Sequence, residues 1–194
     1  MKRRAAVCAW LHAAGWGATL SVVPGAMPAV AWAQADPLVA EHQVKAAYLH
    51  KFLDFVEWPA TAFGTEQSPY VIGVAGADAL ADELEVLVAR RRPNGRPVVA
   101  RRLRPGESPA DLHVLFVGRG AAARLGALLA AAEKQPTLTV TETEEGFAAG
   151  SMISFAVEDK RVRFDVAVRR AEASEVKISS RLLGVARRVV GAPS

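Results

Sequence analysis

Residues 70–89 read YVIGVAGADALADELEVLVA, an apolar run that passes through a glycine-containing turn into a helical pattern. Tyr70 to Val74 contains no charged residue, which is typical of a strand buried on both faces of a sheet. Asp78 to Ala89 repeats its leucines and valines at helical spacing, which predicts an amphipathic helix. A strand that leads directly into a helix is the building unit of an α/β fold.

The same alternation of strand and helix continues on both sides of this unit. A first helix is expected between Asp36-Pro37 and Pro59, and later helices are expected over residues 120–134 and 174–190. Two further strands, 152–157 and 162–168, predict a hairpin whose turn is Glu158-Asp159-Lys160-Arg161. The remaining strands are expected at residues 98–103, 112–117 and 137–141. The sequence predicts an α/β fold: a mostly parallel sheet flanked by helices, with a C-terminal antiparallel hairpin and a final helix.

The first 33 residues predict an export signal. Lys2-Arg3-Arg4 is followed by an apolar segment, and Ala31-Trp32-Ala33 supplies the small residues that precede a cleavage site. A membrane anchor is the alternative, but glycines and Pro24 interrupt the run of about 20 apolar residues that spanning needs. We expect residues 1–33 to be removed and residues 34–194 to form one domain without its own membrane span. Such a protein is exported, and it is periplasmic in a cell with an outer membrane.

The net charge and the cysteine content of the predicted domain differ from those of the whole chain, because the predicted signal contributes to both. The chain has 51% hydrophobic and 23% charged residues, which excludes a disordered or collagen-like protein. The signal holds three of the 24 basic residues and no acidic one, so residues 34–194 have 21 basic and 20 acidic residues. A nearly neutral domain does not favour nucleic-acid binding. The single cysteine, Cys8, lies in the signal, which excludes disulfides and cysteine metal ligands from the domain.

Gly73-Val-Ala-Gly76 occupies the place where a dinucleotide-binding fold cradles phosphate, between a strand and a helix N-terminus. The G-x-G-x-x-G pattern is incomplete here, and Asp78 would place a like charge near the phosphates. We interpret the segment as a tight strand-to-helix turn with Asp78 as the helix cap.

No pattern in residues 34–194 points to catalysis or metal binding. His42 and His50 are too far apart for an i, i+4 metal pair, and His113 lies inside a predicted strand. No G-x-S-x-G motif of a serine hydrolase is present. The acidic run Glu142, Glu144 and Glu145 is expected in a solvated loop or at the start of a helix rather than as an acid–base pair. We predict a protein that is not an enzyme and needs no cofactor or metal, with an exported hydrolase as the least favoured class.

The predicted hairpin and its surroundings are the candidates for binding a partner protein, because aromatic side chains rimmed by charge anchor interfaces. We assign this role to Phe147, Glu158, Asp159, Arg161, Phe164, Lys177 and Leu183. Phe147 lies in a predicted loop and is the best surface candidate. Phe155 and Phe164 have a competing interpretation, because alternation along a strand would turn them into the core. Four aromatic residues are expected in the core or at a homodimer face: Tyr48, Phe52, Phe55 and Trp58.

Arginines also allow a second function, a sensor module that binds a small anionic molecule and serves another membrane receptor. Arg163 and Arg170 are the candidate ligand-binding residues, with Arg161 beside them. The arginine-rich stretch of residues 90–104 is expected to be a solvated face, with binding of an anionic ligand, a lipid headgroup or an acidic partner as the alternatives.

Several blocks of sequence, in order along residues 34–194, resemble the YfiR family. The first blocks are VKAAYLHKF at 44–52, FVEWP at 55–59, GRPV at 95–98, HVLFV at 113–117 and LTVT at 138–141. The densest blocks follow: GF at 146–147, GSMISF at 150–155, RVRF at 161–164 and KISSRLL at 177–183. A series of matching blocks with family-like spacing is more specific than any single motif above.

The resemblance implies an exported periplasmic regulator that restrains an inner-membrane diguanylate cyclase through its periplasmic domain. It also implies that an OmpA-like outer-membrane lipoprotein can sequester the regulator, which releases the cyclase and raises cyclic-di-GMP and biofilm formation. A homodimer is expected. One departure from the family is the lack of cysteine in residues 34–194, which excludes redox switching through thiols of this domain.

Overall fold

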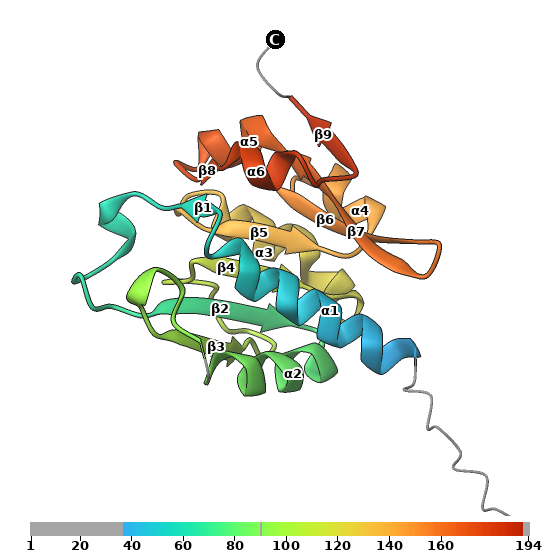
Figure 1. Cartoon of the computed structure of the whole chain (residues 1–194), viewed down its shortest axis with the longest axis horizontal. Coiled ribbons are helices and arrows are strands. Elements are labelled where there is room, and N and C mark those ends of the chain that lie inside the picture. The colour runs from blue at the N-terminus through green and yellow to red at the C-terminus, as the bar shows by residue number, and fades with distance from the viewer. Residues whose placement is uncertain (1–36, 90, 192–194) are drawn as a thin grey trace, which may run out of the picture. The chain divides into compact units, whose positions relative to one another are not determined.

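The computed structural model describes residues 37–89 and 91–191, so the predicted signal at 1–33 lies outside the described residues. A mixed sheet of seven strands is central to the fold, with strand order β3-β2-β4-β5-β6-β7-β9 (Figure 1). Its strands are β2 (Tyr70–Ala75), β3 (Val98–Arg102), β4 (Val114–Val117), β5 (Leu138–Thr141), β6 (Ile153–Glu158), β7 (Arg161–Ala167) and β9 (Arg188–Val190). Only the β6–β7 pair is antiparallel within this sheet. The predicted α/β fold with a mostly parallel sheet and a C-terminal hairpin is confirmed.

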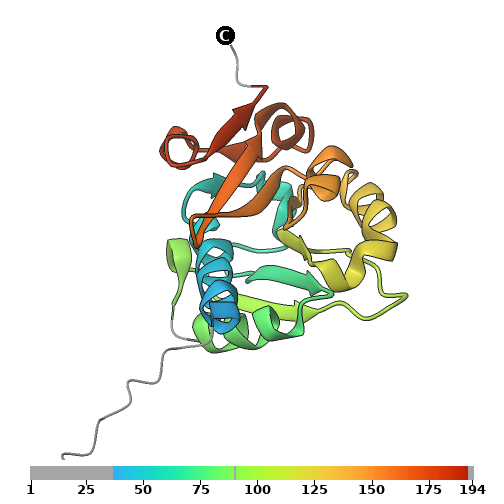
Figure 2. The same ribbon diagram turned by 90° about the vertical axis from the view of Figure 1, so that its right-hand side faces the viewer.

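Helices cover both faces of the sheet, as the end-on view shows (Figure 2). The helices are α1 (Pro37–Phe52), α2 (Asp78–Val88), α3 (Leu125–Ala132), α4 (Glu144–Ala148), α5 (Val168–Ala173) and α6 (Ser180–Leu183). The long helices α1 and α2 pack together on one face, and α3 and α4 lie on the other. A small second sheet pairs β1 (Val56–Glu57) with β8 (Lys177–Ile178). None of the helices among the described residues has the length and apolar character needed to cross a membrane.

The prediction of one long helix over residues 174–190 is wrong. That segment instead forms β8, α6 and β9 in succession. Glu175 adopts a left-handed conformation with φ 57°, which breaks a helix at its start. Ser179 then begins a new short helix, where its hydroxyl accepts a hydrogen bond from the Leu182 backbone N–H at 3.4 Å. After α6 the chain pairs with β7, beginning with the Arg187 N–H, which donates to the Phe164 carbonyl at 2.8 Å.

An aromatic cluster joins α1 to the hairpin strands. Phe52 and Tyr48 of α1 pack against Phe155 and Phe164, with ring centroids 5.4 to 6.0 Å apart. Phe155 and Phe164 are directly opposite each other in the β6–β7 ladder. Both are buried, so the core interpretation of these two residues is correct and the assignment of Phe164 to partner binding is wrong. The reason is the two-residue side-chain period of a strand, which directs 155 and 164 to the same covered face.

A second aromatic cluster encloses His113. The rings of Trp58, Phe63 and Tyr70 lie within 4.5 to 6.0 Å of its imidazole. Its Nδ1 atom accepts a hydrogen bond from the Val71 backbone N–H at 3.1 Å. Burial disfavours the charged imidazolium and lowers the pKa of His113 to about 4, with the nearby Arg96 acting in the same direction and the Ala62 backbone opposing it.

Because the folded state binds this proton less readily than the unfolded chain does, stability should fall as the pH is lowered from about 6.5 to about 4. The full effect for His113 is about 3 kcal/mol in the free energy of unfolding. Burial also lowers the pKa of His50, so this residue adds a further loss of stability as the pH is lowered. His113→Asn keeps a hydrogen-bond acceptor for Val71 and removes the titration, so the variant should lose less stability across this range. Urea unfolding at a series of pH values, with pH 8 as the reference, measures this difference. If the free energy of unfolding changes with pH as steeply in the variant as in the wild type, His113 is not the source of the pH dependence.

Candidate protein-interaction site

The carboxyl ends of β2 and β4 form the topological switch point of the sheet, where doubly wound folds bind ligands. In this protein the backbone around Gly76 packs directly against Gly120 and Ala121 at the switch point and fills the space where such a ligand would bind. The Gly120 N–H donates to the Gly76 carbonyl at 3.1 Å, and a Cβ on Gly76 would lie 2.1 Å from the Ala121 nitrogen. The segment is the tight strand-to-helix turn that the sequence predicts, with β2 ending at Ala75 and α2 beginning at Asp78. Asp78 is the first helical residue rather than the cap, which is Ala77.

Next to this turn, a buried lysine fastens α1 to the end of β5. The Lys45 ammonium donates to carboxylate oxygens of Glu41 and Glu142, each at 2.5 Å. Glu142 also accepts a hydrogen bond from the Arg119 backbone N–H at 2.9 Å. The expectation that Glu142 lies in a solvated loop is therefore wrong, because the lysine of a distant helix reaches it. Glu144 and Glu145 are exposed in the first turn of α4, which agrees with the helix-start alternative for these two residues.

Within residues 37–89 and 91–191, no group of three or more His, Cys, Asp and Glu side chains is placed to hold a metal ion. The lysine and carboxylates at the end of β5 are already paired with one another.

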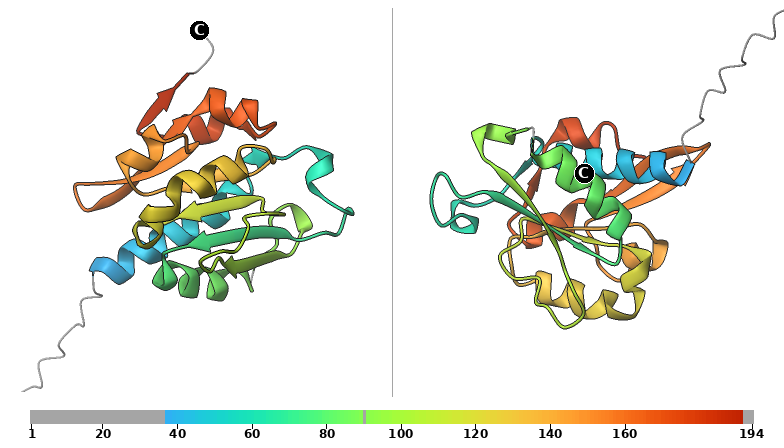
Figure 3. Two further views of the ribbon diagram at one scale, coloured as in Figure 1. Left: turned by 180° about the vertical axis from the view of Figure 1, so that it is seen from behind. Right: turned by 90° about the horizontal axis from the view of Figure 1, so that it is seen from below.

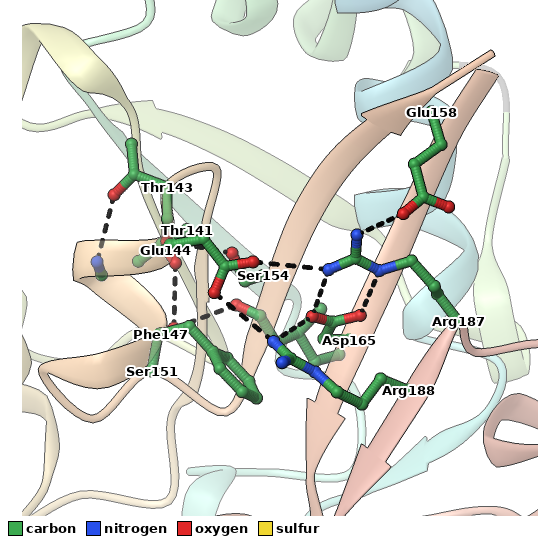
Figure 4. Close-up of polar contacts among 12 residues, drawn as sticks. Thr141, Thr143, Glu144, Phe147, Ser151, Ser154, Glu158, Asp165, Arg187 and Arg188 are labelled. Carbon is green, nitrogen blue, oxygen red and sulfur yellow. Dashed lines mark hydrogen bonds and ion pairs between the residues drawn. The ribbon is translucent and has the colours of Figure 1, made fainter. Parts of the chain in front are cut away.

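An ion-pair network holds β9 against the hairpin (Figure 4). Asp165 of β7 is fully buried, and its carboxylate accepts two hydrogen bonds from Arg187, at 2.7 and 2.6 Å, and one from Arg188 at 2.6 Å. Arg187 also donates to Glu158 at 2.6 Å, and both arginines approach Glu144 at 3.4 Å. Burial alone would raise the pKa of Asp165, but the two arginines hold that pKa below its usual value. The hydrogen bonds to Asp165 and Glu158 in turn raise the pKa of Arg187.

Phe147 lies beside this network and is buried, so the prediction that it is the best surface candidate is wrong. Its segment is the short helix α4, because the Thr143 hydroxyl caps the helix by accepting from the Gly146 N–H at 3.1 Å. The guanidinium groups of Arg170 and Arg188 lie 5.6 and 5.3 Å from the centre of its ring. Arg170 also donates to the Phe147 carbonyl at 2.5 Å and to the Ser151 carbonyl at 3.2 Å.

The tip of the β6–β7 hairpin extends past the rest of the sheet, as seen from behind and below (Figure 3). Asp159 and Lys160 form its turn with φ values of 48° and 60°, the positive values of a type I′ turn. Between the hairpin and the first turns of α1 lies a hollow of about 630 Å³, which we call the α1–hairpin groove. Its lining consists of Ala40, Glu41, Val44, Tyr48, Val157, Lys160, Arg161, Val162 and Arg163.

Apolar side chains are unusually open in the α1–hairpin groove. Val44 of α1 is 41% exposed and Val157 of β6 is 50% exposed. Exposed apolar residues that gather in a hollow rimmed by charge are a feature of protein-binding surfaces. The sequence does not identify either valine as exposed. Val44 belongs to the apolar stripe of a helix and Val157 to an apolar strand, and most apolar residues of both segments face the core.

Only part of the predicted partner-binding set lies at the groove. Arg161 belongs to its lining, and Asp159 is exposed at the adjoining turn. Glu158 is committed to Arg187 in the network described above. Lys177 lies on β8, where it is the cross-strand neighbour of Glu57, and Leu183 is half-buried on α6, so neither contributes to the groove.

The predicted ligand-binding arginines do not share a pocket. Arg163 lines the α1–hairpin groove, whereas Arg170 borders a separate pocket of about 470 Å³ together with Glu133, Thr139 and Ser174. The separation arises because the two side chains extend from different elements, β7 and α5.

Solved structures of similar shape include a conserved domain protein from Vibrio cholerae O1 biovar El Tor. It is 13% identical with a TM-score of 0.53, over 76% of this chain and 60% of that protein, and the likeness concerns the fold alone. The chain thus spans less than two thirds of that structure. An ABC domain from Streptococcus pneumoniae in complex with L-Trp is 9% identical with a TM-score of 0.49, over 62% of this chain and 55% of that one. The comparison with curated proteins gives no match.

The model of the YfiR/HmsC-like family matches residues 42–187, which include α1 from His42 onward, the whole hairpin and the first residues after α6. This family is associated with periplasmic regulation of cyclic-di-GMP signalling, a regulatory rather than a catalytic role. The match extends over most of the described residues, and the chain belongs to the YfiR/HmsC-like family.

Proposed function

We propose that this protein represses an inner-membrane diguanylate cyclase by binding its periplasmic domain, and so lowers cyclic-di-GMP and biofilm formation. The observation that carries the proposal is the family match over residues 42–187. The α1–hairpin groove supports it, because it offers exposed apolar side chains with charged groups at their margin. An OmpA-like outer-membrane lipoprotein and a second copy of this chain are the further partners in this proposal.

Repression of this kind acts by a shift of populations. The regulator must bind the inactive conformation of the cyclase more tightly than the active one, since equal affinity for both would shift nothing. A shift from mostly active to mostly inactive needs a difference of about 5.5 kcal/mol between the two binding free energies. A lipoprotein that competes for the same regulator would remove this bias by lowering the free concentration of the repressor.

Deleting the gene for this protein is expected to raise cellular cyclic-di-GMP severalfold, because the cyclase would lose its bound repressor. Mass spectrometry of nucleotide extracts measures the change, and surface attachment provides a second readout. The control is the same deletion in a strain whose target cyclase is inactivated, where cyclic-di-GMP should stay at its basal level. Unchanged cyclic-di-GMP in the strain with an intact cyclase would contradict the proposal.

A further inference from the structure

One side of α1 is open to a binding partner. Gln43 faces α2, where its amide donates to Glu83 at 3.3 Å. Ala40, Val44 and Tyr48 repeat every four residues and line the α1–hairpin groove instead. The stripe has the spacing at which one helix packs against another, and within the described residues no helix occupies that side of α1.

The charges at the groove are mostly positive and lack acidic partners. Lys160, Arg161 and Arg163 belong to the lining, and among the described residues none of them forms an ion pair. Glu41 is the acidic residue of the lining, and its carboxylate is bound to Lys45 at 2.5 Å. Glu158 is likewise bound, to Arg187, which leaves Asp159 at the turn as the free acid nearest to the three cations in sequence.

We infer that the α1–hairpin groove binds an acidic amphipathic helix of the partner protein. Apolar side chains of that helix contact Val44, Tyr48 and Val157, and its carboxylates pair with the three cations. This inference rests on the proposed function, because it names the chemistry of the partner at the groove. An anionic membrane surface offers the same negative charge, but the valines and cations line a hollow, which a helix fills better than a lipid surface does.

Charge reversal inside the cell tests the location of the site. Lys160→Glu, Arg161→Glu and Arg163→Glu combined should raise cyclic-di-GMP to the level of the gene deletion, because the groove would repel an acidic helix. The matched control reverses three other exposed cations away from the groove: Arg91, Arg92 and Lys134. This control should repress as the unmodified protein does. Envelope levels and thermal unfolding of both variants show whether each is folded.

The outcomes separate the inference from the proposed function. If the deletion raises cyclic-di-GMP but the groove variant represses normally, the groove inference is overturned and the proposed function stands. If the deletion itself changes nothing, the proposed function fails, and the binding assay with purified protein still decides the chemistry of the groove.

That assay uses a labelled amphipathic peptide of leucine and glutamate, about 18 residues or five helical turns long. Fluorescence anisotropy should show binding that weakens with added salt and is about tenfold weaker for the groove variant. Val44→Ser with Val157→Ser should weaken it as well, whereas the reversal at Arg91, Arg92 and Lys134 should not. A leucine–lysine peptide of equal length should not bind. Absence of binding by the acidic peptide would overturn the inference, as would binding to phosphatidylglycerol vesicles that is stronger than peptide binding and lost in the groove variant.

Discussion

Replacing Asp165 with asparagine is expected to lower the free energy of unfolding by about 3 kcal/mol. Asp165 is completely buried and supplies the charge that both Arg187 and Arg188 need. An asparagine of nearly the same size turns an amide N–H₂ toward guanidinium donors, so at least one hydrogen bond is lost. The two arginines also lose their buried counter-charge and keep only the exposed carboxylates of Glu158 and Glu144. The two arginines are partly exposed and can be hydrated, which keeps the cost at the low end for a buried ion pair. Urea unfolding of the purified domain measures the difference.

Glu158→Gln and Glu144→Gln are the matched controls for this experiment. Both glutamates bind the same arginines, but their side chains are more than half exposed. Exposed ion pairs contribute about 1 kcal/mol or less, so each control should stay within that limit. A loss below about 1 kcal/mol for Asp165→Asn would contradict the central role of the buried carboxylate.

The pH dependence of the Asp165 effect provides a further check. The arginines lower the pKa of this carboxyl group in the folded state, so its contribution is complete above the ordinary aspartate pKa. That contribution is lost as the pH falls through the lowered folded-state pKa. The stability difference between wild type and Asp165→Asn should therefore shrink at strongly acidic pH and stay constant near neutrality. This region lies below the range in which His113 titrates, so the two effects can be separated.

Lys45→Met should destabilise the protein by about 3 to 5 kcal/mol. Lys45 is 1% exposed, and its ammonium group lies between the carboxylates of Glu41 and Glu142. Methionine fills a similar volume but leaves Glu142, which is itself largely buried, as an uncompensated charge. Denaturant unfolding measures the loss.

A second substitution distinguishes loss of the ion pair from loss of packing. Glu142→Gln combined with Lys45→Met removes the orphaned charge, so the double variant should recover a large part of the lost stability. Lys51→Met is the control on the same helix, since Lys51 is exposed and pairs with Asp54 at the surface, and it should cost about 1 kcal/mol or less. If the double variant is no more stable than Lys45→Met alone, the cost comes from packing and the ion-pair explanation is incorrect.

Local pattern was sufficient for most of the sheet. The apolar run at 70–74 and the leucine spacing at 78–89 correspond to β2 and α2, and the turn at 158–161 joins β6 to β7 as expected. These features depend on neighbouring residues: alternation places side chains on one face of a strand, and positive φ values at 159 and 160 suit a tight hairpin. For the same reason the core interpretation of Phe155 and Phe164 is correct.

The errors in the sequence analysis arise where distant segments meet. Residues 174–190 have a helical apolar spacing, yet their last part pairs with β7 as strand β9. This pairing also brings Arg187 and Arg188 to Asp165. Phe147 follows a glycine as a surface loop residue would, but Thr143 caps a helix there and two arginines cover the ring. Glu142 belongs to an acidic run, and only the position of α1 brings Lys45 to it.

Short-range chemistry therefore determines the α/β class, the hairpin and its charged turn, because periodicity and turn preference act between residues close in the chain. Tertiary structure decides which charged side chains form ion pairs and which remain without an acidic or basic partner. Glu158 and Arg161 are neighbours across one turn, yet Glu158 is bound to an arginine from β9 while Arg161 lines the α1–hairpin groove. That division depends on contacts between β9, β7 and α1, segments far apart in the sequence, and it arises only when the folded chain brings them together.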